Sequence, residues 1–187
     1  MERLTVETVV YRPVEEVYEF LLDFPGYANY SKYLESVREL EPRGGEQARY
    51  ALRFAWWKIQ YTARSAVTET VPSERIEWTI LDSLDANGRW VVEPREELPE
   101  DAPEWAESAT AVRFEVAWRS DSVDSGTVDL PRLVSLGWVI EKVEPIFEKE
   151  ARRVVSRAAA DLEGRHREVE LSVQTEHVEE TAGERQT

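Results

Sequence analysis

The sequence predicts an α+β fold in which a curved antiparallel sheet of about six to seven strands wraps round a long C-terminal helix. Segments with alternating apolar side chains follow one another with links of hairpin length, which favours antiparallel neighbours. A single long amphipathic stretch comes after them, and its apolar stripe has to be buried against one face of the sheet.

The N-terminal part predicts one strand followed by one or two short helices. Residues 3–11 alternate apolar and polar side chains, as a strand does. Pro13 suits the first turn of a helix, where a backbone N–H has no partner, and apolar side chains follow at helical spacing up to Phe24. The Pro-Gly pair at 25–26 ends this helix, and the next stretch, 27–34, predicts a second short one.

Further strands are predicted by the same period-two alternation. They are residues 36–40, 49–57, 59–67, 75–81, 89–93 and 110–119. Residues 85–88 (DANG) are typical of a hairpin turn, because Asn and Gly tolerate positive φ. A stretch rich in acids and prolines precedes the last strand and predicts a solvated loop, called the acidic loop here (residues 94–108).

A long helix is predicted from near Leu130 to Leu162, with a kink or break expected at Pro145. The chain beyond this helix is polar and has only weak periodicity. We therefore expect one folded domain over residues 1–165 and a disordered C-terminal tail over residues 166–187.

The composition excludes several classes of function. The chain has 187 residues and a net charge of −15, which argues against nucleic acid as a partner because its phosphates would have to be neutralised. It holds no Cys, which excludes thiol catalysis, disulfides and thiolate metal sites.

The composition of the charged residues indicates the salt concentration in which the protein works. Of the 23 basic residues 19 are Arg and only 4 are Lys. A surface that has few lysines and many carboxylates stays soluble in concentrated salt. We interpret the chain as halophilic, with an ordinary acidic protein as the alternative. Residues 1–12 lack the pattern of a signal peptide, so we expect a cytoplasmic protein.

No residue pattern predicts a catalytic centre. Both histidines, His166 and His177, lie at or beyond the end of the long helix, away from the expected core. The sequence has no nucleophile motif, no Gly-rich phosphate loop and no recognisable metal-ligand spacing. We therefore predict no catalytic residue, no metal and no cofactor; whether the protein is an enzyme stays open, with the balance against it.

Large rings recur on one alternating face of successive strands. With one tryptophan of the long helix they are the candidate cavity-lining residues: Tyr50, Phe54, Trp56, Tyr61, Trp78, Trp90, Phe114, Trp118 and Trp138. Such rings either line a ligand pocket or pack as an ordinary core. Arg64 is the candidate polar group of the cavity; the alternative is a place on the outer face, paired with an acid.

Two other aromatic groups also allow two interpretations. Tyr27, Tyr30 and Tyr33 recur at steps of three and either line an entrance or pack by their rings. Trp56 and Trp57 stand at an expected hairpin tip, where adjacent side chains point to opposite faces. One of them is either covered by a neighbouring segment or exposed, and an exposed Trp would make transient contact with a membrane interface or a protein partner.

Four segments carry a resemblance to a known superfamily: residues 6–18 (VETVVYRPVEEVY), 21–27 (LLDFPGY), 33–37 (YLESV) and 134–162, which contains the tripeptide PIF. In their order and spacing the chain resembles the START-like superfamily of polyketide cyclases/dehydrases and lipid-transport proteins. The N-terminal segment is most similar to the coenzyme Q-binding START family. The resemblance implies a helix-grip fold with a cavity between sheet and helix for an apolar ligand.

The acidic loop departs from the family pattern, and it either lies over the cavity mouth or stands free in solvent. We expect residues 1–165 to be a START-like domain that binds or transports an apolar small molecule, a lipid or an isoprenoid quinone. The alternatives are a polyketide cyclase/dehydratase-type enzyme on the same fold and a protein–protein interaction module, because a fold does not decide function. The sequence predicts no oligomeric state.

Overall fold

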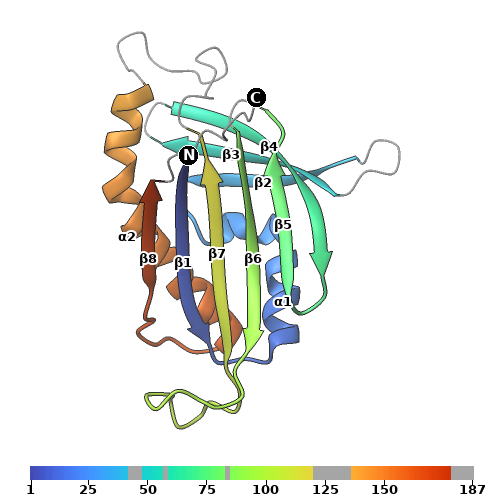
Figure 1. The fold of residues 1–187 in the computed structure, drawn as a ribbon, viewed down its shortest axis with the longest axis vertical. Helices are drawn as coiled ribbons and strands as arrows, with labels where there is room; N and C mark the ends of the chain where they lie inside the picture. The colour runs from blue at the N-terminus through green and yellow to red at the C-terminus, as the bar shows by residue number, and fades with distance from the viewer. Residues whose placement is uncertain (42–47, 57–58, 83–84, 120–135, 178–187) are drawn as a thin grey trace, which may run out of the picture.

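The computed structural model describes residues 1–41, 48–56, 59–82, 85–119 and 136–177. They form an 8-stranded antiparallel sheet in the order β2-β3-β4-β5-β6-β7-β1-β8 (Figure 1). The strands are β1 (Glu2–Val10), β2 (Leu34–Leu40), β3 (Arg49–Trp56), β4 (Ile59–Val71), β5 (Arg75–Ile80), β6 (Ala86–Pro94), β7 (Thr110–Trp118) and β8 (Ser172–His177). The helices are α1 (Val14–Leu22), the 3-10 helix η1 (Phe24–Asn29) and α2 (Leu136–Glu163). This arrangement confirms the predicted α+β fold.

The sheet is strongly curved, and β2 and β3 run across the direction of β1 and β7 (Figure 1). Two register shifts contribute to the curvature, one between β2 and β3 at Leu34/Ser36 and one between β4 and β5 at Val67/Glu69. An irregularity of this kind bends a strand and increases its local twist. The helices lie on one side of the curved sheet, and a space between the sheet and the helices is lined by residues of both (Figure 1).

One side of α1 packs on the sheet. Its buried residues recur at helical spacing: Val14, Val17, Tyr18 and Leu21. Glu15 and Glu16 lie in its first turn, where the helix dipole favours negative charge. The following helix, η1, is capped by Asp23, whose side chain accepts a hydrogen bond from the backbone N–H of Gly26 at 3.3 Å.

The tightly packed core lies between α1 and the sheet. Its buried residues come from α1 and the facing strands: Val10, Val14, Val17, Tyr18, Leu21, Tyr50, Val67, Ile76, Val92 and Val112. Ile76 and Val17 are 0% and 1% exposed, so side chains fill this part of the enclosed space. Room for a ligand therefore has to lie towards α2.

The helix α2 is continuous through Pro145, so the break expected there is not found. Gly164 follows its last residue with a φ of 70°, a conformation that favours glycine at a helix end. The side chain of Trp138 belongs to the part of α2 whose side chains lie outside the described residues.

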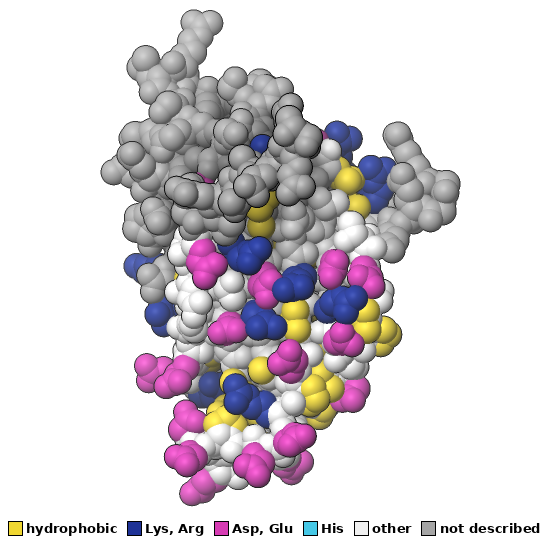
Figure 2. Space-filling model, in the orientation of Figure 1, with side chains coloured by type: hydrophobic (Ala, Val, Ile, Leu, Met, Phe, Trp, Pro, Cys, Tyr) yellow, Lys and Arg dark blue, Asp and Glu magenta, His cyan; other side chains and the backbone are white. Residues whose placement is uncertain are grey.

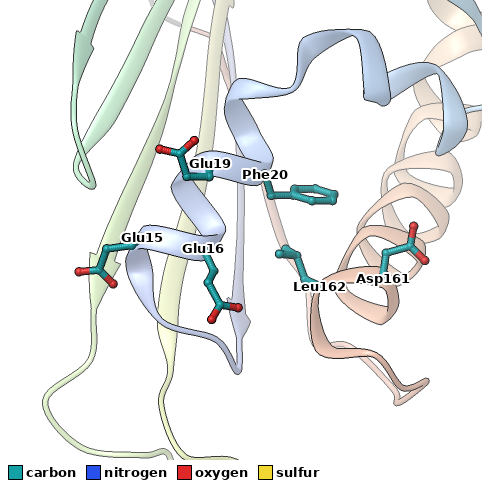
Figure 3. A pocket seen from close by; sticks show the side chains of 6 residues that line it. All are labelled: Glu15, Glu16, Glu19, Phe20, Asp161 and Leu162. Carbon is teal, nitrogen blue, oxygen red and sulfur yellow. The ribbon is translucent and has the colours of Figure 1, made fainter.

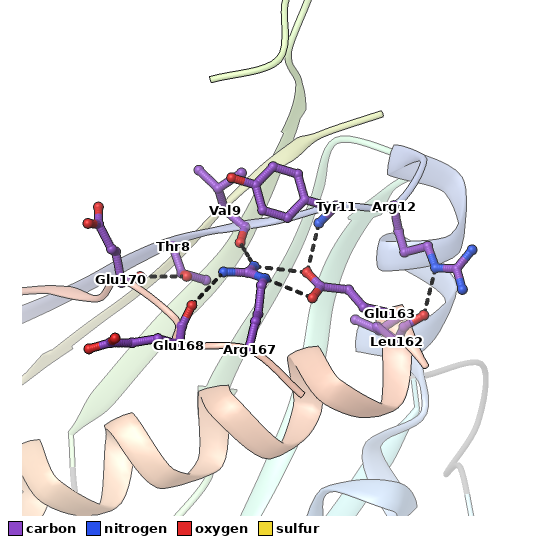
Figure 4. Close-up of polar contacts among 9 residues, drawn as sticks. All are labelled: Thr8, Val9, Tyr11, Arg12, Leu162, Glu163, Arg167, Glu168 and Glu170. Carbon is purple, nitrogen blue, oxygen red and sulfur yellow. Dashed lines mark hydrogen bonds and ion pairs between the residues drawn. The ribbon is translucent and has the colours of Figure 1, made fainter. Parts of the chain in front are cut away.

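A buried ion pair fastens the end of α2 to β1 (Figure 4). The fully buried carboxylate of Glu163 accepts hydrogen bonds from the backbone N–H of Tyr11 at 2.9 Å and from Nε and Nη2 of Arg167, each at 2.8 Å. Arg167 Nη2 also donates to the carbonyl oxygen of Val9 at 2.7 Å. These charge-assisted bonds join the helix to the first strand and fix one end of the enclosed space.

Part of the segment expected to be a disordered tail is a strand. Ser172–His177 form β8, which pairs antiparallel with β1 from Glu7↔Ser172 to Glu2↔His177. Residues 169–175 (VELSVQT) carry the period-two alternation that indicates a strand, and β1 supplies the partner. The ordered domain therefore extends beyond residue 165, and residues 178–187 lie outside the described residues.

The turn expected at residues 85–88 is not found there, because β6 begins at Ala86. Gly88 lies inside this strand and pairs with Trp78 of β5. A Cβ atom at Gly88 would collide with the Trp78 ring and with the carbonyl oxygen of Glu115. The glycine is therefore required by the close approach of an indole ring rather than by a positive φ.

The outer face of the sheet carries acidic and basic side chains side by side (Figure 2). Arg113 lies 3.1 Å from Glu115, 3.7 Å from Glu7 and 3.9 Å from Glu93, and Arg89 lies 2.8 Å from Glu115. The planar guanidinium group of arginine has several N–H donors and can pair with several carboxylates at once. The excess of Arg over Lys thus matches a surface on which a single arginine, such as Arg113, faces several acids.

Candidate functional site

A cavity of about 540 Å³ lies between the inner face of the sheet and the helices. Its sheet wall comes from β1, β3, β6 and β7, and its other walls come from α1, from residues 27–34 and from α2. The described lining is almost entirely apolar or aromatic.

The strand register explains why the side chains of the sheet wall meet. Val6 of β1 pairs with Phe114 of β7, and Phe114 pairs in turn with Trp90 of β6. Directly paired residues point to the same face of a sheet, so these three side chains line the cavity together. The rings of Trp90 and Phe114 lie 4.5 Å apart between centroids, and Phe54 of β3 adds a third ring to the lining.

The opposite wall is a stripe of small aliphatic side chains on α2. It consists of Ala151, Val154, Val155, Ala158, Ala159 and Leu162. These residues recur at helical spacing and so share one face of the helix. Protein interiors are normally packed without large voids, and here alanines opposite large rings leave a space between the described side chains.

Tyrosines from η1 and the residues after it close the cavity. The hydroxyl of Tyr27 donates to the carbonyl oxygen of Leu21, and burial raises the pKa of Tyr27. The hydroxyl of Tyr30 donates to Oδ2 of Asp161 at 2.8 Å; burial and this carboxylate raise the pKa of Tyr30 to about 12. Both phenols are therefore neutral at physiological pH and already have hydrogen-bond partners.

A second carboxylate of α2 reaches the same segment. Oε1 of Glu150 accepts a hydrogen bond from Oγ of Ser31 at 3.1 Å and one from the backbone N–H of Lys32 at 3.0 Å. Glu150 and Ser31 both line the cavity. The seam between residues 30–32 and α2 is thus held by two carboxylates, Glu150 and Asp161.

The described part of the lining contains no Arg, Lys or His. Among all described residues, no group of three or more His, Asp or Glu is placed to hold a metal ion. In the described part of the chain, no helix is long and apolar enough to cross a membrane.

The structure brings together three of the predicted cavity residues, namely Phe54, Trp90 and Phe114. Two others support them from the same face: Tyr61 stacks on Phe54 with 6.5 Å between ring centroids, and Trp78 stacks on Phe114 at 6.1 Å.

Two of the remaining predicted rings, Tyr50 and Trp118, do not line the described cavity. Tyr50 belongs to the core beside Phe24, at 4.7 Å between centroids, and Trp118 pairs with Ala86 away from the cavity. The side chains of Trp56 and Trp138 lie outside the described residues. The face on which these rings recur is therefore shared by a cavity wall and an ordinary core.

Arg64 lies on the outer face and not in the cavity. Its side chain is exposed, and its Nε lies 2.7 Å from Oδ2 of Asp82. The role of a polar cavity group is thus corrected to an outer-face ion pair. The reason is strand parity: Ala63 and Ser65 on either side of Arg64 are buried.

The acidic loop does not stand wholly free in solvent, and none of its residues belongs to the described cavity lining. Its Trp105 packs edge-on against Tyr11, with 5.9 Å between ring centroids, and the guanidinium of Arg165 lies 4.7 Å from the Trp105 ring. The loop is therefore attached near the end of α2 by one aromatic side chain.

Sequence reasoning from aromatic residues alone missed most of the lining. The α2 stripe, the β1 residues and Phe20 of α1 were visible only as apolar positions with helical or strand periodicity. Such positions predict burial, but periodicity does not tell a cavity from a filled core. Both roles considered for Tyr27, Tyr30 and Tyr33 are found: all three belong to the lining, and the rings of Tyr27 and Tyr30 also pack against Phe24 and Phe20.

The fold has many counterparts among solved structures. A protein of Thermus thermophilus matches with a TM-score of 0.57 and 14% identity, over 87% of this chain and 97% of that chain. The aromatase/cyclase Zhui of Streptomyces sp. R1128 matches with a TM-score of 0.55 and 19% identity, over 87% of this chain and 94% of that chain. A START superfamily protein of Mycobacterium smegmatis matches with a TM-score of 0.54 and 14% identity, over 87% of this chain and 99% of that chain.

At these identities the likeness shows the fold, which is START-like as the sequence resemblance implied. A comparison with curated protein sequences finds no match. The model of a family described as polyketide cyclase / dehydrase and lipid transport matches residues 1–159. The chain therefore belongs to the polyketide cyclase / dehydrase and lipid transport family.

Proposed function

We propose that the protein binds or transports an apolar small molecule in the cavity between sheet and α2. The observation that supports this most is the cavity itself, about 540 Å³ in volume with an almost wholly apolar described lining. Ligand pockets commonly have volumes of about 300–1,000 Å³ and few polar groups. Burial of apolar ligand surface contributes about 25 cal/mol per Å² before the costs of association.

Within this class we propose a lipid or an isoprenoid quinone. Rings and branched chains suit the wall of Trp90, Phe114 and Phe54, because aromatic side chains offer large flat contact surfaces. The narrower likeness to the coenzyme Q-binding family stays a prediction from the N-terminal sequence.

A titration with the neutral, environment-sensitive dye Nile red tests the proposal. We expect saturable fluorescence with one site per chain and competition by long-chain lipids. Ala158→Phe should abolish this signal, because the ring enters the cavity, whereas Arg153→Phe on the exposed side of α2 should not. Equal dye binding by both variants would contradict the cavity as the site.

An enzyme of the polyketide cyclase type is the second candidate. It is favoured by the Tyr30 hydroxyl on the cavity wall, which as a neutral phenol can donate a hydrogen bond to a substrate carbonyl. Aromatase/cyclases are among the proteins with this fold. Such an enzyme would release Tyr30 from Asp161 on binding, so Tyr30→Phe would abolish turnover of a poly-β-ketone while leaving dye binding intact.

We propose further that the protein works in a salt-rich cytoplasm. The net charge of −15 and the ion pairs of the outer face support this, since salt screens the self-repulsion of the acids. Thermal unfolding in rising KCl tests the proposal. The midpoint should rise steadily up to molar salt, and a flat or falling midpoint would contradict it.

A further inference from the structure

We propose that the cavity prefers ligands whose polar end donates hydrogen bonds, a hydroxyl or an ammonium group, over ligands that end in an anion, with Glu150 as the specificity-determining residue. The inference rests on the proposed ligand-binding function and names the class of ligand that the same cavity takes. Three observations lead to it: the placement of Glu150, the charge of the adjoining cleft, and the charge of the described lining.

Glu150 is a carboxylate on the wall of an apolar cavity, and neighbours fix its orientation. Both of its described hydrogen bonds end on Oε1, which accepts from Ser31 Oγ at 3.1 Å and from the Lys32 N–H at 3.0 Å. The other oxygen, Oε2, keeps its capacity to accept a hydrogen bond from a ligand. Because two hydrogen bonds hold Oε1, the carboxylate is oriented before a ligand arrives.

The cleft next to the cavity is acidic as well (Figure 3). It has a volume of about 520 Å³ and is lined by Glu15, Glu16, Glu19 and Asp161 together with Phe20 and Leu162. Phe20 and Leu162 also line the cavity, so these two side chains form a wall shared by cleft and cavity. The described lining of this cleft thus holds four acidic residues and no basic one.

The basic groups of this region lie outside the cavity lining. Arg12 Nε is 3.8 Å from Glu16, Arg157 Nη1 is 3.4 Å from the Tyr30 carbonyl oxygen, and Lys32 Nζ is 4.7 Å from the centre of the Tyr33 ring. None of the three contributes to the described lining. Among the described residues, the cavity lining thus offers a ligand anion no cation and holds one carboxylate, Glu150.

The consequence for ligand choice follows from electrostatics. A desolvated anion without a partner is strongly disfavoured, and Glu150 adds repulsion at short range. A hydroxyl or ammonium group instead donates to the Glu150 carboxylate, and hydrogen bonds to an ionised acceptor are strong. Among isoprenoid quinones the reduced form should therefore bind better than the oxidised form, whose carbonyl oxygens only accept.

The test compares three ligands of equal chain length, dodecanol, dodecylammonium and dodecanoate, as competitors of Nile red below their micelle concentrations. For the unaltered protein we expect dodecanoate to need at least about tenfold higher concentration than the other two, as a nearby like charge predicts. Glu150→Gln should reduce the ratio between the competing concentrations of dodecanoate and dodecylammonium about tenfold. Glu168→Gln, the same change at an exposed residue off the cavity, should leave it unchanged.

Each other outcome has a defined meaning. Dodecanoate binding as tightly as dodecanol would overturn the inference. So would a Glu150→Gln substitution that changes the affinity for all three ligands equally, because an equal change indicates a merely structural role of Glu150. Absence of binding for Nile red and for all three ligands would overturn the proposed function itself. The two failures are thus distinguishable.

Discussion

Filling the cavity from α2 tests whether the space exists. Ala158 lies in the middle of the small-residue stripe and faces the sheet wall across the cavity. Ala158→Leu adds three carbon atoms to this stripe without a large change in helix propensity. If the space is empty in the free protein, the new side chain becomes buried without displacing any neighbour.

The expected gain follows from the buried carbon atoms. At about 0.8 kcal/mol for each buried carbon, Ala158→Leu should raise the free energy of unfolding by about 2 kcal/mol. For a domain of this size that corresponds to a rise of about 4–8 °C in the melting temperature. In a filled core the same change would force neighbours apart and lower the free energy of unfolding by about 1–3 kcal/mol. The two possibilities therefore differ in sign.

The assay is thermal and urea unfolding of ligand-free protein, followed by circular dichroism. Arg153→Leu serves as the control, because it places the same side chain on the exposed side of α2. We expect Ala158→Leu to be stabilised relative to this control and to bind apolar ligands less well. A destabilised Ala158→Leu variant would refute the account of the cavity as an unfilled space.

Three further predictions concern the fold. Glu163→Gln should lower the free energy of unfolding by about 3 kcal/mol in urea unfolding, since it leaves a largely buried arginine unpaired, whereas Glu168→Gln should change it little. Gly88→Ala should lower the free energy of unfolding by about 1–3 kcal/mol, with part of the loss recovered by Trp78→Phe in the same chain. Burial raises the pKa of several tyrosines above the ordinary value of 10.0. Their contribution to the free energy of unfolding is therefore fully present below pH 10 and is lost as the pH rises further. Absorbance at 295 nm should show the ionisation of these tyrosines, and circular dichroism should show the loss of structure over the same pH range.

Each of these three has a clear contrary result. Equal stability of the Glu163→Gln and Glu168→Gln variants would contradict the role given to the buried ion pair. An unchanged melting temperature for Gly88→Ala would contradict the close approach of the indole ring. Ionisation of all seven tyrosines near pH 10 in the folded protein would contradict their burial.

The order of elements could be predicted because local patterns decide it. Each of these signals lies within a short stretch of sequence: the alternation in β1 and β7, the proline at the start of α1 and the apolar stripe of α2. Where the prediction failed, a distant partner decided the structure. β8 forms because β1 offers a free edge, and Gly88 belongs to a strand because Trp78 lies over it.

The candidate site was predictable only in part. Strand parity placed Phe54, Trp90 and Phe114 on the inner face, and the register of the sheet then brought Trp90 and Phe114 together. The sequence could not show that Tyr50, on the same face, would join the core, because α1 packs there. Nor could it place Glu150, whose role depends on contacts with residues far away in the chain.

The most direct test of the central claim is native mass spectrometry of the protein purified from its own cells, followed by solvent extraction of any added mass. The account predicts one bound apolar molecule per chain that is released by solvent, with a hydroxyl or cationic polar end. A protein that carries no ligand, and that no member of a panel of lipids and quinones stabilises against unfolding, would contradict it.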